Sequence, residues 1–521
     1  MGEEVTRAMP LLRRHLPTVL LVLIVLLGAF LRFFWIGAKT VWLDEAFSVW
    51  IARHSLPDLW SWLIRIDQHP LLYYTLLHFW QAIFGDLQGA VRAFSALCGA
   101  LTLPLLYLAA RRLFDAPTAL IATLILAVSP LHIRFAQEAR MYTLLTLGVA
   151  AALFCLVHLL MDETRRPMRS YWLGLAAAQA AVMLTHNTAT VLFPIALNGA
   201  VGGALLWKYW QGTVSSWPAL NDAGFERRWL RGQALAFVLW LPWAIPFVIQ
   251  AVVVDRKFWL PAPTLDAVWE VFHNFNAAFA PDWLPLYPLW DWLYWLLALL
   301  GVAALRRTPA RALLLLSLWL LPFVIELLVS LRRPIFYERT LLWASLPYYL
   351  LLALGIRRLG SVEGAGGNWL RAPVQGLLLA GMVTLSTLGL VGYYFFFEKE
   401  DWSKAAGYVA EHSQAGDLIL FNATWVQIPF DYYFRHYATE AERRGLPVDL
   451  FDRGELEPEM TEADVATLRA LIEGRRRVWL VYSHDWYTDP NQIIPRELSQ
   501  LMRRTDQRHF EGLQVMRFEA R

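Results

Sequence analysis

The chain has 521 residues, of which 57% are hydrophobic and 17% are charged, and its net charge is +3. Soluble domains have roughly 45–50% apolar and about 25% charged residues, so an ordinary soluble enzyme is excluded. Residues 398–521 hold 22 of the 43 acidic and 16 of the 46 basic residues, which leaves an apolar, basic body and a polar, acidic tail. This division gives no support for nucleic-acid binding, which needs a basic face on a soluble module. The two cysteines both fall in apolar runs, so a disulfide scaffold is excluded as well.

The first 395 residues contain eleven apolar runs that are candidates for membrane-spanning helices, because a span needs about 20 predominantly apolar residues. The first run is long and lacks a small-residue cleavage site, so we interpret it as a retained helix rather than a signal peptide. The runs cover approximately residues 17–36, 89–110, 116–133, 141–160, 171–186, 188–207, 232–251, 285–304, 312–330, 340–355 and 375–395.

The distribution of Lys and Arg predicts the orientation of these helices, because basic residues of short loops stay on the cytoplasmic side. With the N-terminus inside, the cytoplasmic segments hold 18 basic residues and the outer segments 10. An odd number of helices then places the tail outside. We therefore predict a multi-pass protein of the cell (inner or plasma) membrane with a cytoplasmic N-terminus.

The tail alternates helix-like and strand-like segments, which predicts a small α/β domain. Residues 402–413, 425–437, 461–473 and 493–504 have helical patterns, and strands are expected at 417–421, 477–483 and from about 513. We expect two domains: a transmembrane domain over 1–395, which includes an amphipathic first outer loop at 37–88, and an extracytoplasmic α/β domain over 396–521. No phosphate-binding glycine loop interrupts the tail, so a nucleotide site there is unsupported.

The first outer loop places two adjacent carboxylates, Asp44 and Glu45, a few residues past the first helix. Such carboxylates near the membrane surface could act as a general base. Alternatively, Asp44 caps the helix that follows and Glu45 is solvated in its first turn. His69, which precedes Pro70, is either the start of an interfacial helix with proline in its first turn or a site residue.

The second outer segment, SPLHIRFAQEARMYT from Ser129 to Thr143, brings several charged and polar residues into a short connection. Unpaired charges would be costly there. One interpretation is an internal salt-bridge network that fixes the helix ends, and another is a polar cavity wall that binds an anionic headgroup. The residues concerned are His132, Arg134, Glu138, Arg140 and Tyr142.

A third outer segment, RRPIFYERT, holds Arg333, Tyr337 and Arg339 at a helix junction. Arginine suits phosphate because its planar fork donates two parallel hydrogen bonds. Glu326, in the preceding apolar run, is an intramembrane carboxylate and a functional candidate, although pairing with a neighbouring Arg explains it equally well. A charged loop at 255–276 could cap a site or be solvated.

These motifs, taken in order, resemble the GT-C membrane glycosyltransferases, specifically the dolichyl-phosphate-mannose protein mannosyltransferase group (family 39) and its bacterial relatives, which include aminoarabinose lipid A transferases. The resemblance rests on LDE after the first helix, HPLLYY, QEARMYT, FYERTLLWASLPYYLLLALGI and DWSKAAGYVAEHSQAGDLILF. HPLL replaces the frequent HPPL of the family, and ERT stands where many members have RY. These departures affect mainly the assignment of phosphate contacts.

The resemblance implies a GT-C fold with about 11 transmembrane helices and an inverting transfer of one sugar, a hexose or pentose, from a polyprenyl-phosphate donor to an acceptor hydroxyl. Asp44 would be the catalytic base and Glu45 its acidic neighbour. His69, Glu138, Arg140 and Tyr142 would line the cavity, and Arg339 would contact the donor phosphate. Arg134, Arg333 and Tyr337 complete the expected donor and acceptor contacts, with Tyr73 as a stacking aromatic.

The expected partners are a polyprenyl-phosphate-linked sugar, the lipid bilayer and an acceptor glycolipid, polysaccharide or protein, with no nucleic acid. The resemblance implies that no cofactor or metal is required, and the sequence lacks ligand spacing that would demand one. A divalent cation shared by Asp44, Glu45 and His69 is the alternative. Two rival functions are a polytopic transporter or lipid flippase, and a non-catalytic assembly protein.

Overall fold

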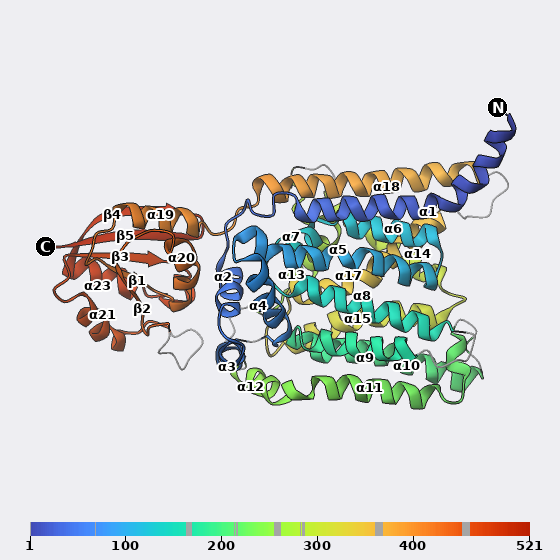
Figure 1. Cartoon of the computed structure of the whole chain (residues 1–521), viewed down its shortest axis with the longest axis horizontal. Coiled ribbons are helices and arrows are strands. Elements are labelled where there is room, and N and C mark those ends of the chain that lie inside the picture. Colours follow the sequence, from blue (N-terminus) through green and yellow to red (C-terminus); the bar gives the residue numbers. More distant parts are fainter. Residues whose placement is uncertain are drawn as a thin grey trace. The chain divides into compact units, whose positions relative to one another are not determined.

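The computed structural model describes residues 2–67, 69–162, 169–212, 214, 217–254, 262–281, 283, 287–359, 368–450 and 459–521. They form two compact units (Figure 1). The membrane unit comprises Met1–Phe34, Gln68–Tyr73 and Arg92–Phe397, and the mixed unit comprises Trp35–Asp67, Tyr74–Val91 and Glu398–Arg521. The sequence assigned the whole segment 37–88 to the transmembrane domain, whereas most of it packs within the mixed unit.

Long helices build the membrane unit and run roughly side by side in a bundle (Figure 1). Each helix pairs its backbone N–H and C=O groups internally, as a lipid environment requires because it offers no hydrogen-bond partners. The helices are α1 (Gly2–Phe33), α5 (Gln88–Leu113), α6 (Ala116–Val128), α7 (Pro130–Ala136), α8 (Tyr142–Leu160), α9 (Arg169–Met183), α10 (Asn187–Gln211), α11 (Phe225–Trp240), α12 (Ala244–Val254), α13 (Leu265–Ala277), α14 (Tyr287–Ala304), α15 (Pro309–Ser330), α16 (Glu338–Leu341), α17 (Ser345–Leu359) and α18 (Asn368–Val391).

Eight helical stretches among the described residues are long and apolar enough to cross a membrane, and α6 with α7 adds a ninth if the bent pair is one span. The expected number was about eleven. Among the described residues each of the eleven runs overlaps a helix, but α9 has only 15 residues and the apolar part of α14, Leu289–Ala304, is also short. The chain is a multi-pass membrane protein.

The predicted run 116–133 is not one straight helix, because α6 and α7 meet at an angle of 59° between Val128 and Pro130. Proline has no N–H, and its ring clashes with the carbonyl four residues earlier, here that of Leu126. The guanidinium of Arg32 on α1 donates to the freed carbonyls of Leu126 and Ala127, each at 3.1 Å. The break therefore has its own hydrogen-bond partner inside the bundle, and it redirects α7.

The α14–α17 contact depends on two glycines. A Cβ on Gly301 of α14 would overlap the carbonyl oxygen of Leu351, and a Cβ on Gly355 of α17 would overlap that of Leu297. Small residues let membrane helices approach this closely, and the gain is backbone packing rather than hydrophobic burial.

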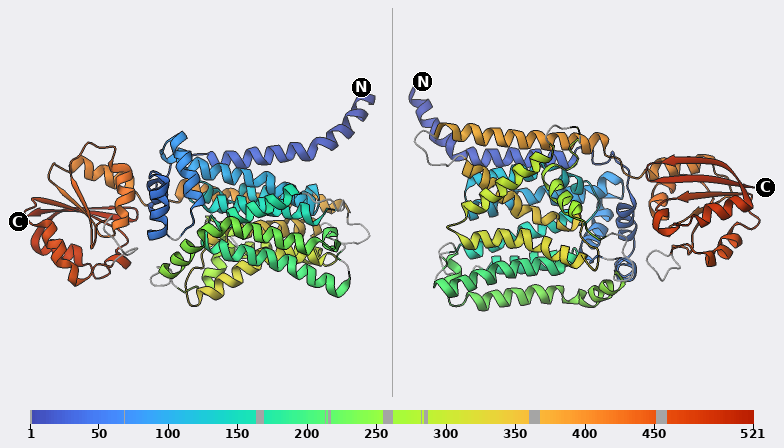
Figure 2. Two further views of the ribbon diagram at one scale, coloured as in Figure 1. Left: turned by 60° about the horizontal axis from the view of Figure 1, so that its bottom comes forward. Right: turned by 180° about the vertical axis from the view of Figure 1, so that it is seen from behind.

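The mixed unit contains a five-stranded sheet in the order β2-β1-β3-β5-β4, in which β1 is parallel to β2 and β3, and β5 is antiparallel to β3 and β4. Helices lie on both faces of the sheet (Figure 2). The elements are α2 (Leu43–Ala52), α3 (Leu56–Ile66), α4 (Leu72–Phe84, mostly in this unit), α19 (Trp402–His412), β1 (Leu418–Phe421), α20 (Gln427–Phe434), β2 (Glu442–Gly445), α21 (Val465–Ile472), β3 (Arg477–Tyr482), α22 (Asp485–Thr488), α23 (Ile493–Leu501), β4 (Met502–Phe510) and β5 (Leu513–Ala520).

Alternate residues of the central strands enter two separate cores, because successive side chains of a strand point to opposite faces. Ile419 and Phe421 pack with α19 and α20, whereas Leu418 and Leu420 pack with α21 and α23. The sequence predicts β1, β3 and β5 but misses two strands: β2, and β4, whose first residues it assigns to a helix over 493–504. β4 reads MRRTDQRHF and lies at the sheet edge, where charged side chains block further pairing and hide the apolar alternation of a strand.

Candidate functional site

The corner between α7 and α8 holds a charged network. Arg134 Nη1 lies 2.8 Å from Glu338 Oε1, and Arg134 Nε lies 3.4 Å from Glu138 Oε1. The Glu138 side chain is 1% exposed, that of Glu338 is 9% and that of Arg134 is 17%. Asn274 on α13 donates to the second oxygen of Glu338. The salt-bridge network predicted for this segment is therefore present, and it extends to a carboxylate 204 residues away.

The residues before and at the start of α16 lie around the same corner. Burial is the largest cause that raises the pKa of Tyr337. The neighbouring Glu338 and Tyr142 raise this pKa further, whereas Arg339 and Arg134 lower it. The guanidinium carbon of Arg339 lies 4.9 Å from the centroid of the Tyr337 ring, a cation–π contact. The sequence-predicted residues Arg134, Tyr142, Tyr337 and Arg339 thus come together from two distant segments.

A histidine that the sequence analysis did not single out lies in this cluster. His186 is buried, and its ring lies 5.1 Å from that of His69 and 6.2 Å from that of Tyr142. Burial lowers the pKa of His186 well below its usual value, and the neighbouring His69, Arg339 and Arg140 lower it further. The two arginines act as nearby positive charges, which disfavour the protonated imidazole.

Tyr73 and Arg140 are joined through Ser95 on α5. The Tyr73 hydroxyl lies 3.0 Å from Ser95 Oγ, which in turn donates to the carbonyl of Arg140 at 3.1 Å. Tyr73 is fully buried. Its ring contacts Phe94 within the membrane unit, so it braces the turn that carries Arg140, and its predicted role as an aromatic for sugar stacking remains a prediction.

The remaining candidates of the third segment lie beside the network. Arg333 is partly exposed and donates to the carbonyl of Ala251. Glu326 is fully buried on α15 and accepts a hydrogen bond from Thr340. Among the described contacts its partner is this hydroxyl, in place of the arginine that the sequence offered as an explanation.

Asp44 and Glu45 belong to the mixed unit, on the first turn of α2. Glu45 is fully buried, and one of its carboxylate oxygens lies 3.0 Å from Nζ of Lys399, whose side chain is 3% exposed. Asp44 is partly exposed, and its carbonyl accepts a hydrogen bond from Ser48. The two carboxylates therefore have different surroundings although they are adjacent in sequence.

The structural alternatives for the first outer loop are wrong in three respects. The N-cap of α2 is Trp42, so Asp44 lies inside the helix rather than capping it. Glu45 is buried in an ion pair rather than solvated. His69 and Pro70 precede α4, which begins at Leu72, so Pro70 is outside its first turn.

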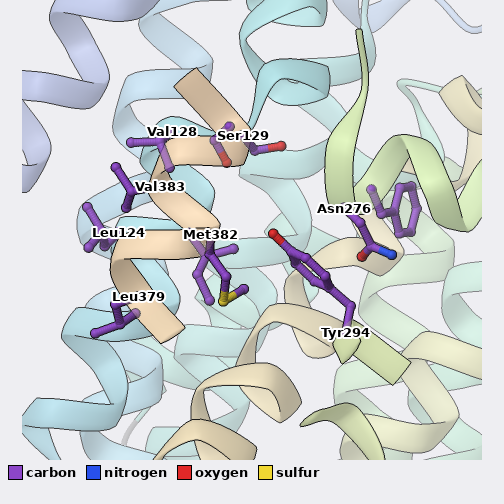
Figure 3. Close-up of a pocket in the computed structure, with 11 residues that line it drawn as sticks. Leu124, Val128, Ser129, Asn276, Tyr294, Leu379, Met382 and Val383 are labelled. Carbon is purple, nitrogen blue, oxygen red and sulfur yellow. The ribbon is translucent and has the colours of Figure 1, made fainter. Parts of the chain in front are cut away.

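Two further features bear on ligands. A cavity of about 10 Å³, which has room for roughly one water, is lined by Ser129, Asn276, Tyr294 and apolar side chains (Figure 3). It contains none of the predicted site residues and is too small for a sugar. In the part of the chain that the structure describes, no group of three or more His, Cys, Asp or Glu side chains is placed to hold a metal ion.

The residues missed by the sequence analysis are Lys399, Asn274, His186 and, as a network member, Glu338. Lys399 has a weak signal, since it is the one base in the acidic run EKED. Asn274 lies on α13, within the segment 255–276 that was expected to be a loop. On the same helix, His273 and Asn276 bond to Asp291 at 2.8 and 2.7 Å. The charged residues at 255–257 lie outside the described residues.

Comparison with known proteins defines the fold. The family model for dolichyl-phosphate-mannose-protein mannosyltransferase matches residues 68–225. Crystal structures of ArnT from Cupriavidus metallidurans, in the apo state and bound to undecaprenyl phosphate, superpose with TM-scores of 0.60 and 0.58 at 12% and 15% identity, and each comparison covers 96% of this chain and 97% of that one. The chain has the GT-C fold. The predicted fold class, a polytopic helical membrane protein with a small C-terminal α/β domain, is thereby confirmed.

One further protein is similar in sequence and one further structure is similar in fold. The undecaprenyl phosphate-α-4-amino-4-deoxy-L-arabinose arabinosyl transferase 2 of Pseudomonas fluorescens is 25% identical over 392 residues, which cover 66% of this chain and 65% of that protein. Archaeal oligosaccharyltransferase AglB from Archaeoglobus fulgidus, in complex with an inhibitory peptide and a dolichol-phosphate, gives a TM-score of 0.58 at 13% identity, with 97% of this chain and 74% of that chain covered. The solved structures share the fold with this chain, and residues 68–225 are similar to the mannosyltransferase family model.

Proposed function

We propose that this GT-C protein transfers one sugar from a polyprenyl-phosphate donor to the hydroxyl of an acceptor, with inversion at the anomeric carbon. The observation that carries the proposal is a cluster of arginines and aromatic rings around His186. The guanidinium carbons of Arg140 and Arg339 lie 5.9 and 4.9 Å from the ring centroids of Tyr142 and Tyr337, and the His186 ring lies 6.2 Å from that of Tyr142 and 5.1 Å from that of His69. A cluster of arginines and tyrosines between the ends of apolar helices suits a lipid phosphate, because arginine binds phosphate oxygens through paired hydrogen bonds.

Within this mechanism, Asp44 accepts the proton of the acceptor hydroxyl as its oxygen attacks the anomeric carbon, and the bond from that carbon to the phosphate oxygen breaks. Arg140 and Arg339 stabilise the negative charge on the departing lipid phosphate. Arg333 is a further candidate for a phosphate contact. Arg134 is engaged by Glu138 and Glu338, so it holds the corner in shape and shares its charge with two carboxylates.

The similar proteins favour this donor class. One relative is named for an undecaprenyl-phosphate-linked aminoarabinose, and an ArnT structure contains undecaprenyl phosphate. An aminoarabinosyl donor is accordingly the first to test, with other pentoses and hexoses after it. The comparisons do not favour a transporter or lipid flippase. The acceptor is a glycolipid, polysaccharide or protein that presents a hydroxyl.

The proposal includes a location and a cofactor requirement. The basic residues of the loops support a cytoplasmic N-terminus in the cell membrane and a C-terminal domain on the outer face, where lipid-linked sugars are available without nucleotide sugars. The reaction needs only charge stabilisation and a proton acceptor, both of which side chains supply. A divalent cation held by Asp44, Glu45 and His69 is the competing form of the mechanism.

The test is release of radiolabelled sugar from a panel of polyprenyl-phosphate donors by the purified protein in lipid, with a membrane extract as acceptor source. Asp44→Asn should abolish acceptor-dependent turnover while donor binding persists, and Asp58→Asn, an exposed acid on α3, is the matched control. Arg339→Gln should weaken binding of the bare polyprenyl phosphate, whereas the exposed Arg332→Gln should not. A chelator in one arm tests the cation.

The proposal fails if no donor is consumed, or if Asp44→Asn turns over as fast as the Asp58→Asn control. Loss of activity with chelator, restored by one divalent ion, would replace the metal-free mechanism by the cation-dependent one. Donor consumption with water as acceptor, insensitive to extract, would identify a hydrolase instead of a transferase.

A further inference from the structure

The C-terminal segment of the mixed unit contributes a residue beside the two acidic side chains of α2. Lys399 lies 354 residues from Glu45 in sequence, and their side chains form a buried ion pair of 3.0 Å. Lys399 Nζ also lies 5.8 Å from the centroid of the Trp42 ring, at the N-cap of α2. A single lysine therefore contacts the residue that starts this helix and the carboxylate on its first turn.

This ion pair constrains where Asp44 can be. Neighbouring residues on an α-helix project about 100° apart, so fixing Glu45 against Lys399 fixes the rotation of α2 and the direction in which Asp44 projects. A buried carboxylate without its cation would move toward water or take up a proton. In either case the ion pair that holds the rotation of α2 is lost, and the direction in which Asp44 projects is less constrained.

Other contacts of the same C-terminal segment hold the chain around α2. The Thr40 hydroxyl donates to the carbonyl of Glu400 at 2.8 Å, and the Val41 amide donates to the Tyr433 hydroxyl at 2.7 Å. Two residues after Glu45 on α2, the rings of Phe47 and Trp425 lie 5.2 Å apart in a T-shaped contact. These contacts act on both the entry and the side of α2.

Hydrogen bonds also tie the far end of the first outer loop to α20. Tyr432 donates to the carbonyl of Asp86 at 2.8 Å, and Arg435 donates to both carboxylate oxygens of Asp86 at 3.1 and 3.3 Å. The α/β domain is thus bonded to the outer loop at residues 40–47 and again at residue 86.

We propose that Lys399 is a positioning residue for the acidic pair Asp44–Glu45, and that the C-terminal domain is a structural part of the catalytic site rather than only a module that selects the acceptor. This inference rests on the proposed function, because it assigns Lys399 an effect on sugar transfer. The proposed role of Lys399 is to act through Glu45 rather than to bind the donor or the acceptor.

The experiment compares Lys399→Met, Lys399→Arg and Lys404→Met in the full-length protein in lipid. Lys404 is five residues away, 78% exposed and paired with Asp401, so it is the matched control. Misplacing a reacting group by 1 Å can cost about 10²-fold in rate, and we expect a loss of about that size in kcat for Lys399→Met, with the donor KM within about threefold of wild type. Lys399→Arg keeps the charge and should recover most of kcat.

A second readout is independent of catalysis. Amide hydrogen exchange over α2 (Leu43–Ala52) should be faster in Lys399→Met than in Lys404→Met, because local opening of the helix becomes easier. Tyr433→Phe, which removes the bond to the Val41 amide, should accelerate exchange at the entry of α2 and leave the ion pair in place.

The outcomes separate the two proposals. If wild-type protein transfers no sugar, the proposed function fails, and so does the positioning role that rests on it. Hydrogen exchange in α2 would still test whether Lys399 stabilises this helix. If wild type is active and Lys399→Met keeps its kcat, or if Lys399→Arg is as inactive as Lys399→Met, the positioning role is refuted. Unchanged exchange in α2 would refute the contact itself.

Discussion

Replacing Arg134 by methionine should be among the most destabilising single changes in the membrane unit. Arg134 lies 2.8 Å from Glu338 and 3.4 Å from Glu138, two carboxylates that are 9% and 1% exposed. Removing one partner of a buried pair costs about 3–5 kcal/mol. If a carboxyl of ordinary pKa takes up a proton at pH 7 instead, the cost is about 3.7 kcal/mol. The two costs are similar, so protonation of a carboxylate would not reduce the loss of stability much.

The assay is thermal unfolding in detergent followed with a thiol-reactive dye, which suits this chain because Cys98 is buried and Cys155 is partly buried. With an unfolding entropy of about 2.1 cal/mol/K per residue over the whole chain, a loss of 3–5 kcal/mol lowers the melting temperature by about 3–5 °C. Arg332→Met, an exposed neighbour of Arg333, is the control and should melt like wild type.

The triple variant Arg134→Met, Glu138→Gln, Glu338→Gln isolates the cause. Without the two negative charges the methionine should cost little, so the triple variant should recover most of the lost melting temperature. The reasoning is refuted if Arg134→Met melts within about 1 °C of the control, or if the triple variant is no more stable than the single one.

Two further predictions concern packing and pH. Gly355→Ala should fold poorly because its Cβ meets the Leu297 carbonyl, whereas Gly376→Ala on α18, with open space around it, should behave like wild type in yield and melting temperature. Lowering the pH from 7.5 to 5.5 should cost about 1.4 kcal/mol through His186, since the unfolded imidazole binds a proton near pH 6.5 and the folded one, with its lowered pKa, does not. His186→Asn, which keeps an acceptor for the Thr188 amide, should flatten that part of the pH dependence of melting; an unchanged slope would contradict the assignment.

The sequence predicts the helices well because one physical signal, about 20 apolar residues in a row, determines each of them. It overestimates the number of long spans, because an apolar run need not be one straight helix. The run at 116–133 contains Pro130, and the prediction did not use this proline to divide the run. The break also needs Arg32, whose side chain fits beside Gly28 and Gly99, since a Cβ on either glycine would crowd the guanidinium. The sequence of the first apolar run does not indicate that Arg32 bonds to the carbonyls of Leu126 and Ala127.

The candidate site was predictable in its residue types and not in its pairings. QEARMYT and FYERT could be recognised as short polar segments between apolar helices, and in the structure both belong to one network. The partner of Arg134 was chosen from neighbouring residues, because sequence spacing gives i,i+4 pairs and says nothing about a carboxylate 204 residues away. The same limit hid Lys399, which lies in the acidic tail.

The two acidic groups illustrate why a short motif underdetermines its chemistry. Asp44 and Glu45 are adjacent and chemically alike, yet burial and Lys399 make Glu45 a structural anion, while Asp44 remains partly exposed on the next position of the helix. A general base must reach the acceptor's proton, which a carboxylate fully buried in an ion pair does poorly. The difference between the two neighbours therefore favours Asp44 as the base, and it arises from a cation that the chain supplies only after all of its membrane helices.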